Sequence, residues 1–243
     1  MQNVKYLAAT CRVPTRLRSI RRKGNNYMTI SNWEESKRRS NYHFDSTIVD
    51  PAVDCVQVLG HVEPTWGDDL ADIIANSNPA TWATRGYKGE GVEAPPEELA
   101  KEEYDLEQQG YGRDYVITHL NWQIPESLQK ISDQFGLADC MNRIHVQHPG
   151  EVWNLHLDKL YKWCPEDPSR VMRIMIQLTD WQPGQFWEYG NYHHRGWRAG
   201  EVTTFDWANL PHSTANAGHS ARVTFQMTGV ITDKTQEFLK SIA

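Results

Sequence analysis

The chain has 243 residues, of which 39% are hydrophobic and 11% aromatic, so it can bury one sizeable core. A charged fraction of 23% is ordinary for a globular protein, and no apolar run approaches the roughly 18 residues that a membrane span requires. The net charge of −6 disfavours a nucleic-acid partner, because contacts to phosphates need a basic surface. The four cysteines are widely spaced, which predicts reduced thiols and a cytoplasmic protein.

The N-terminus differs in charge from the rest of the chain. Residues 1–33 carry seven Lys and Arg and no Asp or Glu, so we expect a basic leader followed by a single domain over residues 34–243. Three interpretations of the leader are open: a disordered or non-native extension with Met28 as the true start, an organelle-targeting peptide, or an arm that binds nucleic acid.

The sequence of the first half of the domain predicts helices and a long loop. We expect an extended segment over 41–62, and apolar residues at positions i, i+3 and i+4 predict a short helix over 67–77. Residues 85–112 are rich in Gly, Pro and Glu and predict a long surface loop that serves as a lid or a recognition surface. A strand over 115–120 and an amphipathic helix over 125–137 complete this half.

After residue 139, short strand-like segments alternate with turns. We expect strands over 143–147, 152–157, 170–179, 185–189, 197–207 and 221–231, and a closing helix over 234–242. Strands of this length and spacing predict a β-sandwich or barrel. The predicted fold class is therefore α+β, with N-terminal helices packed on a β-rich core at about 140–231.

Three segments carry a histidine followed two residues later by a carboxylate: His43 with Asp45, His61 with Glu63, and His156 with Asp158. In a strand, residues i and i+2 point the same way, so such a pair can bind one metal ion. With a distant second histidine it forms a facial triad that suits ferrous iron, because three coordination positions stay open. The motif alone is weak, since the ten histidines of the chain make chance matches common.

Only the third pair has suitable residues downstream. His212 follows Asp158 after 54 positions, and Arg222 comes ten residues after that histidine. The strand that begins at Arg222 has Arg, Thr, Gln and Thr on one face and Val, Phe and Met on the other, as expected of a strand that lines a cavity. We therefore predict that His156, Asp158 and His212 bind iron.

With these residues, positions 143–230 resemble the double-stranded β-helix (jelly-roll) core of the Fe(II)/2-oxoglutarate-dependent oxygenase superfamily. The segment Trp197-Arg198-Ala199-Gly200-Glu201, with Phe205, Asp206, His212 and Arg222, is similar to the aspartyl/asparaginyl β-hydroxylase-like branch. Animal aspartyl β-hydroxylases and the related halogenases typically lack the carboxylate ligand, whereas Asp158 is present here. The complete triad favours hydroxylation or a related oxidation over halogenation.

The resemblance implies Fe(II), 2-oxoglutarate and O2, with succinate and carbon dioxide released as the substrate is oxidised. The far carboxylate of 2-oxoglutarate needs a cation with fork geometry, which Arg222 provides, and Thr224 shares its strand face. Arg173 and Gln177 share a face of their own strand and are candidates for co-substrate or substrate contacts, although a buried ion pair explains Arg173 equally well. Residues that flank the triad are candidates for the substrate wall: Trp153, Asn154, Tyr161, Trp187 and Trp207.

The predicted function is therefore hydroxylation of an amino acid, a peptide side chain or another small metabolite. Two rivals share the predicted fold: a cupin-type metalloprotein that does not use 2-oxoglutarate, and a Trp-rich jelly-roll binding module with an exposed aromatic platform. A cupin without the co-substrate has no need of a buried cation at Arg222, which separates it from the oxygenase. A nucleic-acid demethylase would need the basic leader beside the cavity.

Overall fold

The computed structural model describes residues 56–77, 124–190 and 192–243 of the chain. The predictions for the leader, for the loop over 85–112 and for the strand over 115–120 lie outside these residues. The described elements are β1 (Val56–His61), α2 (Gly67–Ala75), α5 (Glu126–Phe135), β2 (Ala138–Gln147), β3 (Val152–His156), η1 (Tyr161–Trp163), η2 (Pro168–Arg170), β4 (Val171–Gln177), β5 (Gln185–Tyr189), β6 (Tyr192–His194), β7 (Glu201–Phe205), β8 (His212–Asn216), β9 (Arg222–Val230) and α6 (Asp233–Ile242). None of the described helices is long and apolar enough to cross a membrane.

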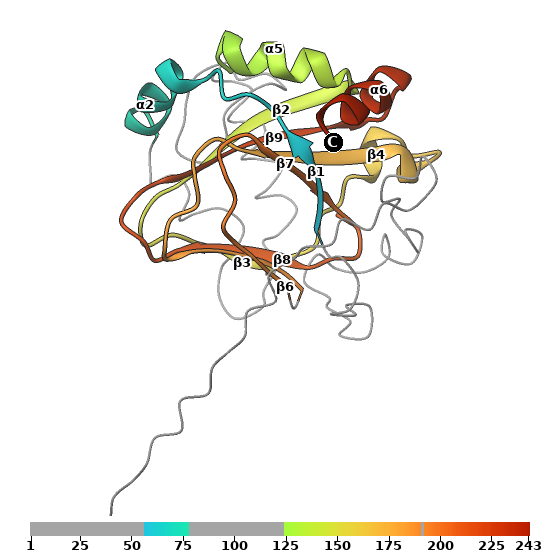
Figure 1. Cartoon of the computed structure of the whole chain (residues 1–243). Coiled ribbons are helices and arrows are strands. Elements are labelled where there is room, and N and C mark those ends of the chain that lie inside the picture. Colours follow the sequence, from blue (N-terminus) through green and yellow to red (C-terminus); the bar gives the residue numbers. More distant parts are fainter. Residues whose placement is uncertain (1–55, 78–123, 191) are drawn as a thin grey trace, which may run out of the picture.

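Two antiparallel sheets form the core and lie one above the other in Figure 1. The larger sheet has five strands in the order β1-β7-β4-β9-β2, and the smaller has four in the order β3-β8-β5-β6. Neighbouring strands come from distant parts of the chain, as when β4 pairs with β7 on one side and with β9 on the other. This two-sheet arrangement, with helices packed on it, confirms the predicted α+β fold with a jelly-roll core.

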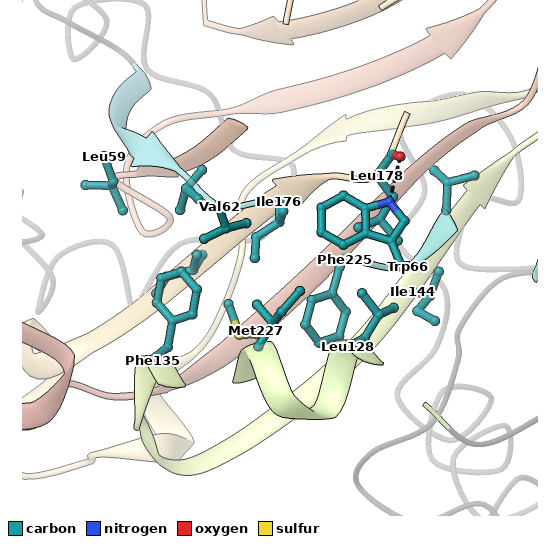
Figure 2. Packing of buried hydrophobic residues seen from close by; sticks show 14 of the residues in the cluster. Leu59, Val62, Trp66, Leu128, Phe135, Ile144, Ile176, Leu178, Phe225 and Met227 are labelled. Carbon is teal, nitrogen blue, oxygen red and sulfur yellow. Dashed lines mark hydrogen bonds between the residues drawn. The ribbon is translucent and has the colours of Figure 1, made fainter. Parts of the chain in front are cut away.

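Helices α2, α5 and α6 cover the outer face of the larger sheet, at the top of Figure 1. Phe225 of β9 belongs to a buried apolar cluster with Leu128 and Phe135 of α5, and Figure 2 shows Leu128 beside Phe225 and Phe135 farther to the left in the same cluster. The indole of Trp66 joins the same cluster, and its Nε1 donates a hydrogen bond of 2.9 Å to the backbone oxygen of Leu178. Packing of the helices therefore removes one face of the sheet from water.

The opposite face of the same strands is polar and points toward the smaller sheet. Its buried polar residues include Arg173 and Gln177 of β4 and Arg222, Thr224, Gln226 and Thr228 of β9. Hydrogen bonds across the two strands join members of this set, so the alternation predicted for both strands is confirmed. A second buried cluster, rich in Trp and Tyr, lies between the two sheets. The interior between the sheets is therefore polar and aromatic.

Several predicted strand boundaries are wrong. β2 begins at Ala138 rather than at residue 143, because it continues to pair with β9 as far as Val230. The strand expected over 197–207 shortens to β7, since Gly200, with φ of 95°, forms a turn immediately before it. The sequence predicts neither β6, which crosses a stretch interpreted as a loop, nor β8. The polar sequence of β8 lacks apolar alternation, and its pairing with β3 and β5 defines it as a strand.

Candidate active site

The structure brings the three predicted metal ligands together from separate strands. His156 ends β3 and is the direct pairing partner of His212, which begins β8. The Nε2 atom of His156 lies 3.7 Å from Oδ1 of Asp158, and Nε2 of His212 lies 3.7 Å from Oδ2. The three ligand atoms lie within 4.8 Å of one another, a spacing at which all three can bind one ion.

The carboxylate reaches this position in a way that differs from the prediction. β3 ends at His156, so Asp158 lies beyond the strand rather than on its face. The backbone N–H of Asp158 donates a hydrogen bond of 3.2 Å to the carbonyl oxygen of Trp207, which ties the segment after the strand to the rest of the fold. The carboxylate is therefore positioned by the segment after the strand, through this backbone hydrogen bond, and not by strand periodicity.

The other histidine–carboxylate pairs do not compete with this site. His61 Nε2 lies 2.7 Å from the backbone oxygen of Ala199, and both His61 and Glu63 are exposed. The pair at 43–45 lies outside the described residues. Within the described segments, the triad is the one group of His, Cys, Asp and Glu with the spacing of a metal site.

Burial and neighbouring charges hold two of the predicted ligands, His212 and Asp158, in the protonation states that bind metal. Burial, followed by the nearby His156, lowers the pKa of His212 to about 3, so this imidazole is neutral at pH 7. Burial raises the pKa of Asp158, but Arg173 and the two histidines outweigh it and lower the pKa to about 2. A neutral imidazole and an ionised carboxylate are the forms that coordinate a divalent cation.

Arg173 lies beside the metal ligands. Its Nη1 donates to Oδ2 of Asp158, and its Nε donates to Oγ1 of Thr228 over 3.1 Å. Of the two interpretations that the sequence leaves open, the buried ion pair is present in the structure. A contact between Arg173 and a co-substrate stays a prediction.

Arg222 is a buried cation with no carboxylate partner among the described residues. It is 1% exposed, and its guanidinium lies 4.4 Å from the ring centroid of Trp187 and 5.5 Å from that of Trp153. Its Nε donates to Oε1 of Gln147 over 3.1 Å, whereas Nη1 has no hydrogen-bond partner in the part of the chain that is described. Burial lowers the pKa of Arg222 to about 9, so it remains charged at neutral pH. A buried, unpaired cation is costly, and the site therefore suits an anionic ligand.

Gln177 and Thr224, both predicted to contact the co-substrate, lie side by side in the structure. Thr224 Oγ1 donates to Gln177 Oε1 over 3.2 Å, which fixes the orientation of the amide. The Nε2 atom of Gln177 is buried and has no hydrogen-bond partner among the described residues. It is a second donor on this inner face, besides Arg222 Nη1, that remains available to an acceptor.

Sequence reasoning misses Tyr189, which lies between the predicted metal triad and the surroundings of Arg222. Its ring stacks on His212 with centroids 6.0 Å apart and on Trp187 with centroids 5.5 Å apart. Since Trp187 contacts Arg222, these ring contacts link His212, a predicted metal ligand, to the buried cation. Burial raises the pKa of Tyr189 well above its usual value, so its hydroxyl is a neutral donor. Its alternation with Trp187 on the predicted strand 185–189 is the signal that points to it.

The residues predicted for the substrate wall are buried in different surroundings. Trp153 and Trp187 both contact the buried guanidinium of Arg222. Tyr161 packs edge-on against Trp207 with ring centroids 5.1 Å apart, and Trp207 Nε1 donates to a backbone oxygen of β4. The side chain of Asn154 lies outside the described part. The contacts of the first pair suit a ligand pocket, and those of the second pair suit core packing.

No family model and no curated protein sequence matches the chain. Among solved structures it resembles a non-heme monooxygenase, ThoJ in complex with nickel, with a TM-score of 0.43 and 13% identity over 73% of this chain and 74% of the other. It resembles CytC3 with Fe(II) and alpha-ketoglutarate with a TM-score of 0.28 and 14% identity over 36% of this chain and 41% of the other. A prolyl-4-hydroxylase of Pseudomonas putida has a TM-score of 0.35 and 18% identity over 71% of this chain and 98% of its own.

The structures that resemble the chain thus include oxygenases and hydroxylases, as does the superfamily that the sequence resembles. Because these TM-scores are below 0.5, the fold assignment rests on the sheet topology and the chemistry rests on the side chains described above. The aspartyl/asparaginyl branch and the roles of the individual site residues stay predictions.

Proposed function

We propose that this protein is a non-haem Fe(II) oxygenase that uses 2-oxoglutarate and O2 to hydroxylate an amino acid, a peptide side chain or another small metabolite. One observation carries the proposal. The buried guanidinium of Arg222 has no carboxylate partner among the described residues, and it lies in the same interior as His156, Asp158 and His212.

The triad supports iron as the metal through its donor set and its openness. Two imidazoles and one carboxylate bind three positions of an octahedral ion and leave three for other ligands. His156 is partly exposed, whereas His212 is 8% exposed, so the site lies where the interior meets the surface. When bound, iron and 2-oxoglutarate supply the oxidising equivalents, and the protein supplies position, charge and shielding from water.

The buried cation supports 2-oxoglutarate as the co-substrate. In our proposal, the far carboxylate of 2-oxoglutarate accepts hydrogen bonds from Arg222, which can offer two parallel N–H groups. The Gln177 amide and the Tyr189 hydroxyl add neutral donors. Trp153 and Trp187 keep water from the guanidinium, and an ionic hydrogen bond is stronger in such a low-dielectric setting.

The same features weigh against the rival functions. A cupin without an anionic co-substrate would leave Nη1 of Arg222 buried without an acceptor among the described residues, which costs free energy that no function of such a protein requires. A Trp-rich binding module would present its aromatic rings to solvent. The tryptophans of the described segments are instead buried or half-buried.

The test is anaerobic reconstitution with Fe(II), followed by 2-oxoglutarate and O2 with a panel of amino acids and short peptides, with succinate as the measured product. We expect wild type to form succinate, Asp158→Ala to lose iron, and Arg222→Met to keep iron but lose 2-oxoglutarate. Arg198→Met is the matched control, because the Arg198 side chain is 79% exposed and its ion pair with Asp180 lies at the surface. If wild type binds no iron, or if all four proteins form succinate at the same background rate, the proposal is wrong.

A further inference from the structure

Arg173 occupies a central position on the inner face of the larger sheet. It lies in β4, between β7 and β9, and is directly opposite Thr228 in the β4–β9 register. Two atoms of its guanidinium are engaged, with Nη1 donating to Asp158 Oδ2 and Nε donating to Thr228 Oγ1 over 3.1 Å. The residue is 8% exposed, so the ion pair is shielded from water.

We propose that Arg173 is a positioning residue that holds Asp158 as a one-oxygen metal ligand and so keeps a coordination position open. The inference rests on the metal centre of the proposed function, but it does not depend on the identity of the substrate. It assigns Arg173 to the metal ligand and not to a carboxylate of the co-substrate or substrate.

The geometry of the carboxylate shows why such a residue is needed. Oδ1 of Asp158 lies 3.7 Å from His156 Nε2, and Oδ2 lies at the same distance from His212 Nε2. Each oxygen is therefore equally close to one imidazole, and the two histidines do not determine which oxygen binds the ion. The hydrogen bond from Arg173 engages Oδ2 and leaves Oδ1 as the oxygen available to bind the ion.

The number of coordination positions makes this selection matter. An octahedral ion has six positions, and two imidazoles with one carboxylate oxygen leave three. The proposed function would use all three, because 2-oxoglutarate would take two positions and O2 would need one. An Asp158 that held the ion through both oxygens would leave only two positions, too few for both co-substrates.

The anchoring of Arg173 suits this role. Because Nε donates a second hydrogen bond to Thr228, on the neighbouring strand, the guanidinium is held at two of its nitrogens. A lysine at this position would supply the charge but not the second hydrogen bond. Partners of metal ligands commonly change metal affinity by about 10–100-fold when they are removed.

The experiment measures Mn(II) binding to the full chain in the absence of 2-oxoglutarate. Two quantities are recorded: the dissociation constant, and the relaxation of water protons, which reports how many exchangeable waters the bound ion carries. The variants are Arg173→Met, Arg173→Lys and Thr228→Val, with Arg198→Met as the exposed control. Circular dichroism and thermal melting show which variants are folded.

We expect Arg173→Met to weaken Mn(II) binding by about 10–100-fold and to lower the number of bound waters from three to two. Arg173→Lys should recover part of the affinity, and Thr228→Val should weaken it by less than Arg173→Met does. The same affinity and relaxation in folded Arg173→Met, or in Arg173→Lys if the first variant does not fold, would overturn the inference. Failure of wild type to bind Mn(II) would instead overturn the metal centre itself.

Discussion

Replacement of Arg222 by methionine tests two effects of this cation separately: the free-energy cost of burying it, and its contribution to the binding of 2-oxoglutarate. Methionine has a similar length and no charge, so the two indole rings that contact Arg222 keep an apolar neighbour. We expect Arg222→Met to fold with a stability close to that of wild type and to lose the stabilisation that 2-oxoglutarate confers.

The structure gives the magnitudes. Lowering the pKa of Arg222 from 12.5 to about 9 corresponds to roughly 5 kcal/mol against the buried charge. Contacts with Trp187 and Trp153 return about 0.5–2 kcal/mol each, and the hydrogen bond to Gln147 returns about 1.5–3 kcal/mol. These terms nearly cancel, so the unliganded variant should be within about 2 kcal/mol of wild type. Loss of two hydrogen bonds to a carboxylate should weaken 2-oxoglutarate binding by about a hundredfold or more.

The assay is thermal or chemical denaturation of the Ni(II)-loaded protein with and without 2-oxoglutarate. At a ligand concentration of about 100 times the wild-type dissociation constant, wild type should gain about 2.7 kcal/mol. A variant with hundredfold weaker binding should gain only about 0.4 kcal/mol under the same conditions. The exposed Arg198→Met variant should gain as much as wild type, since its ion pair with Asp180 is at the surface.

The reasoning is refuted if Arg222→Met gains the same stability from 2-oxoglutarate as wild type does. That result would mean that the anion binds elsewhere or that the neutral donors are sufficient. A loss of more than about 4 kcal/mol in the unliganded variant would contradict the balance of terms, because it would show that the charge itself stabilises the fold.

Three further predictions concern stability. Phe225→Ala should cost about 3–5 kcal/mol in urea unfolding, because Phe225 is 0% exposed, whereas Phe186→Ala, at a side chain 41% exposed, should cost less than about 1 kcal/mol. Gly60→Ala should lower the melting temperature, since the φ of Gly60 is 150° and an added Cβ would lie 1.9 Å from the backbone oxygen of Ile242. Gly67→Ala is the control: an added Cβ there meets no described atom within 4 Å, so the melting temperature should stay unchanged or rise. Ni(II) at about 100 times its dissociation constant should stabilise wild type against unfolding by about 2.7 kcal/mol, and a chelator should reverse this. Under the same conditions, Asp158→Ala should gain less than half of this stabilisation.

Local patterns in the sequence were sufficient to predict those helices and strands whose apolar residues recur at a regular spacing. The helices over 67–75 and 126–135, and the alternating faces of β4 and β9, follow from apolar spacing, and the structure confirms them. The candidate triad also followed from spacing and chain order. Its three ligand atoms are close together in the structure, although Asp158 lies beyond the end of its strand.

The contacts around the triad depend on long-range pairing, which local periodicity does not encode. β8 has a polar sequence and exists as a strand because β3 and β5 pair with its two edges, and that pairing sets His212 opposite His156. The ion pair of Arg173 with Asp158 joins elements that meet only in the folded chain. Sequence spacing alone therefore determined which residues to consider as ligands. The tertiary structure decided that Arg173 neutralises the carboxylate and that, among the described residues, Arg222 has no carboxylate partner, because these contacts form only when distant strands pair.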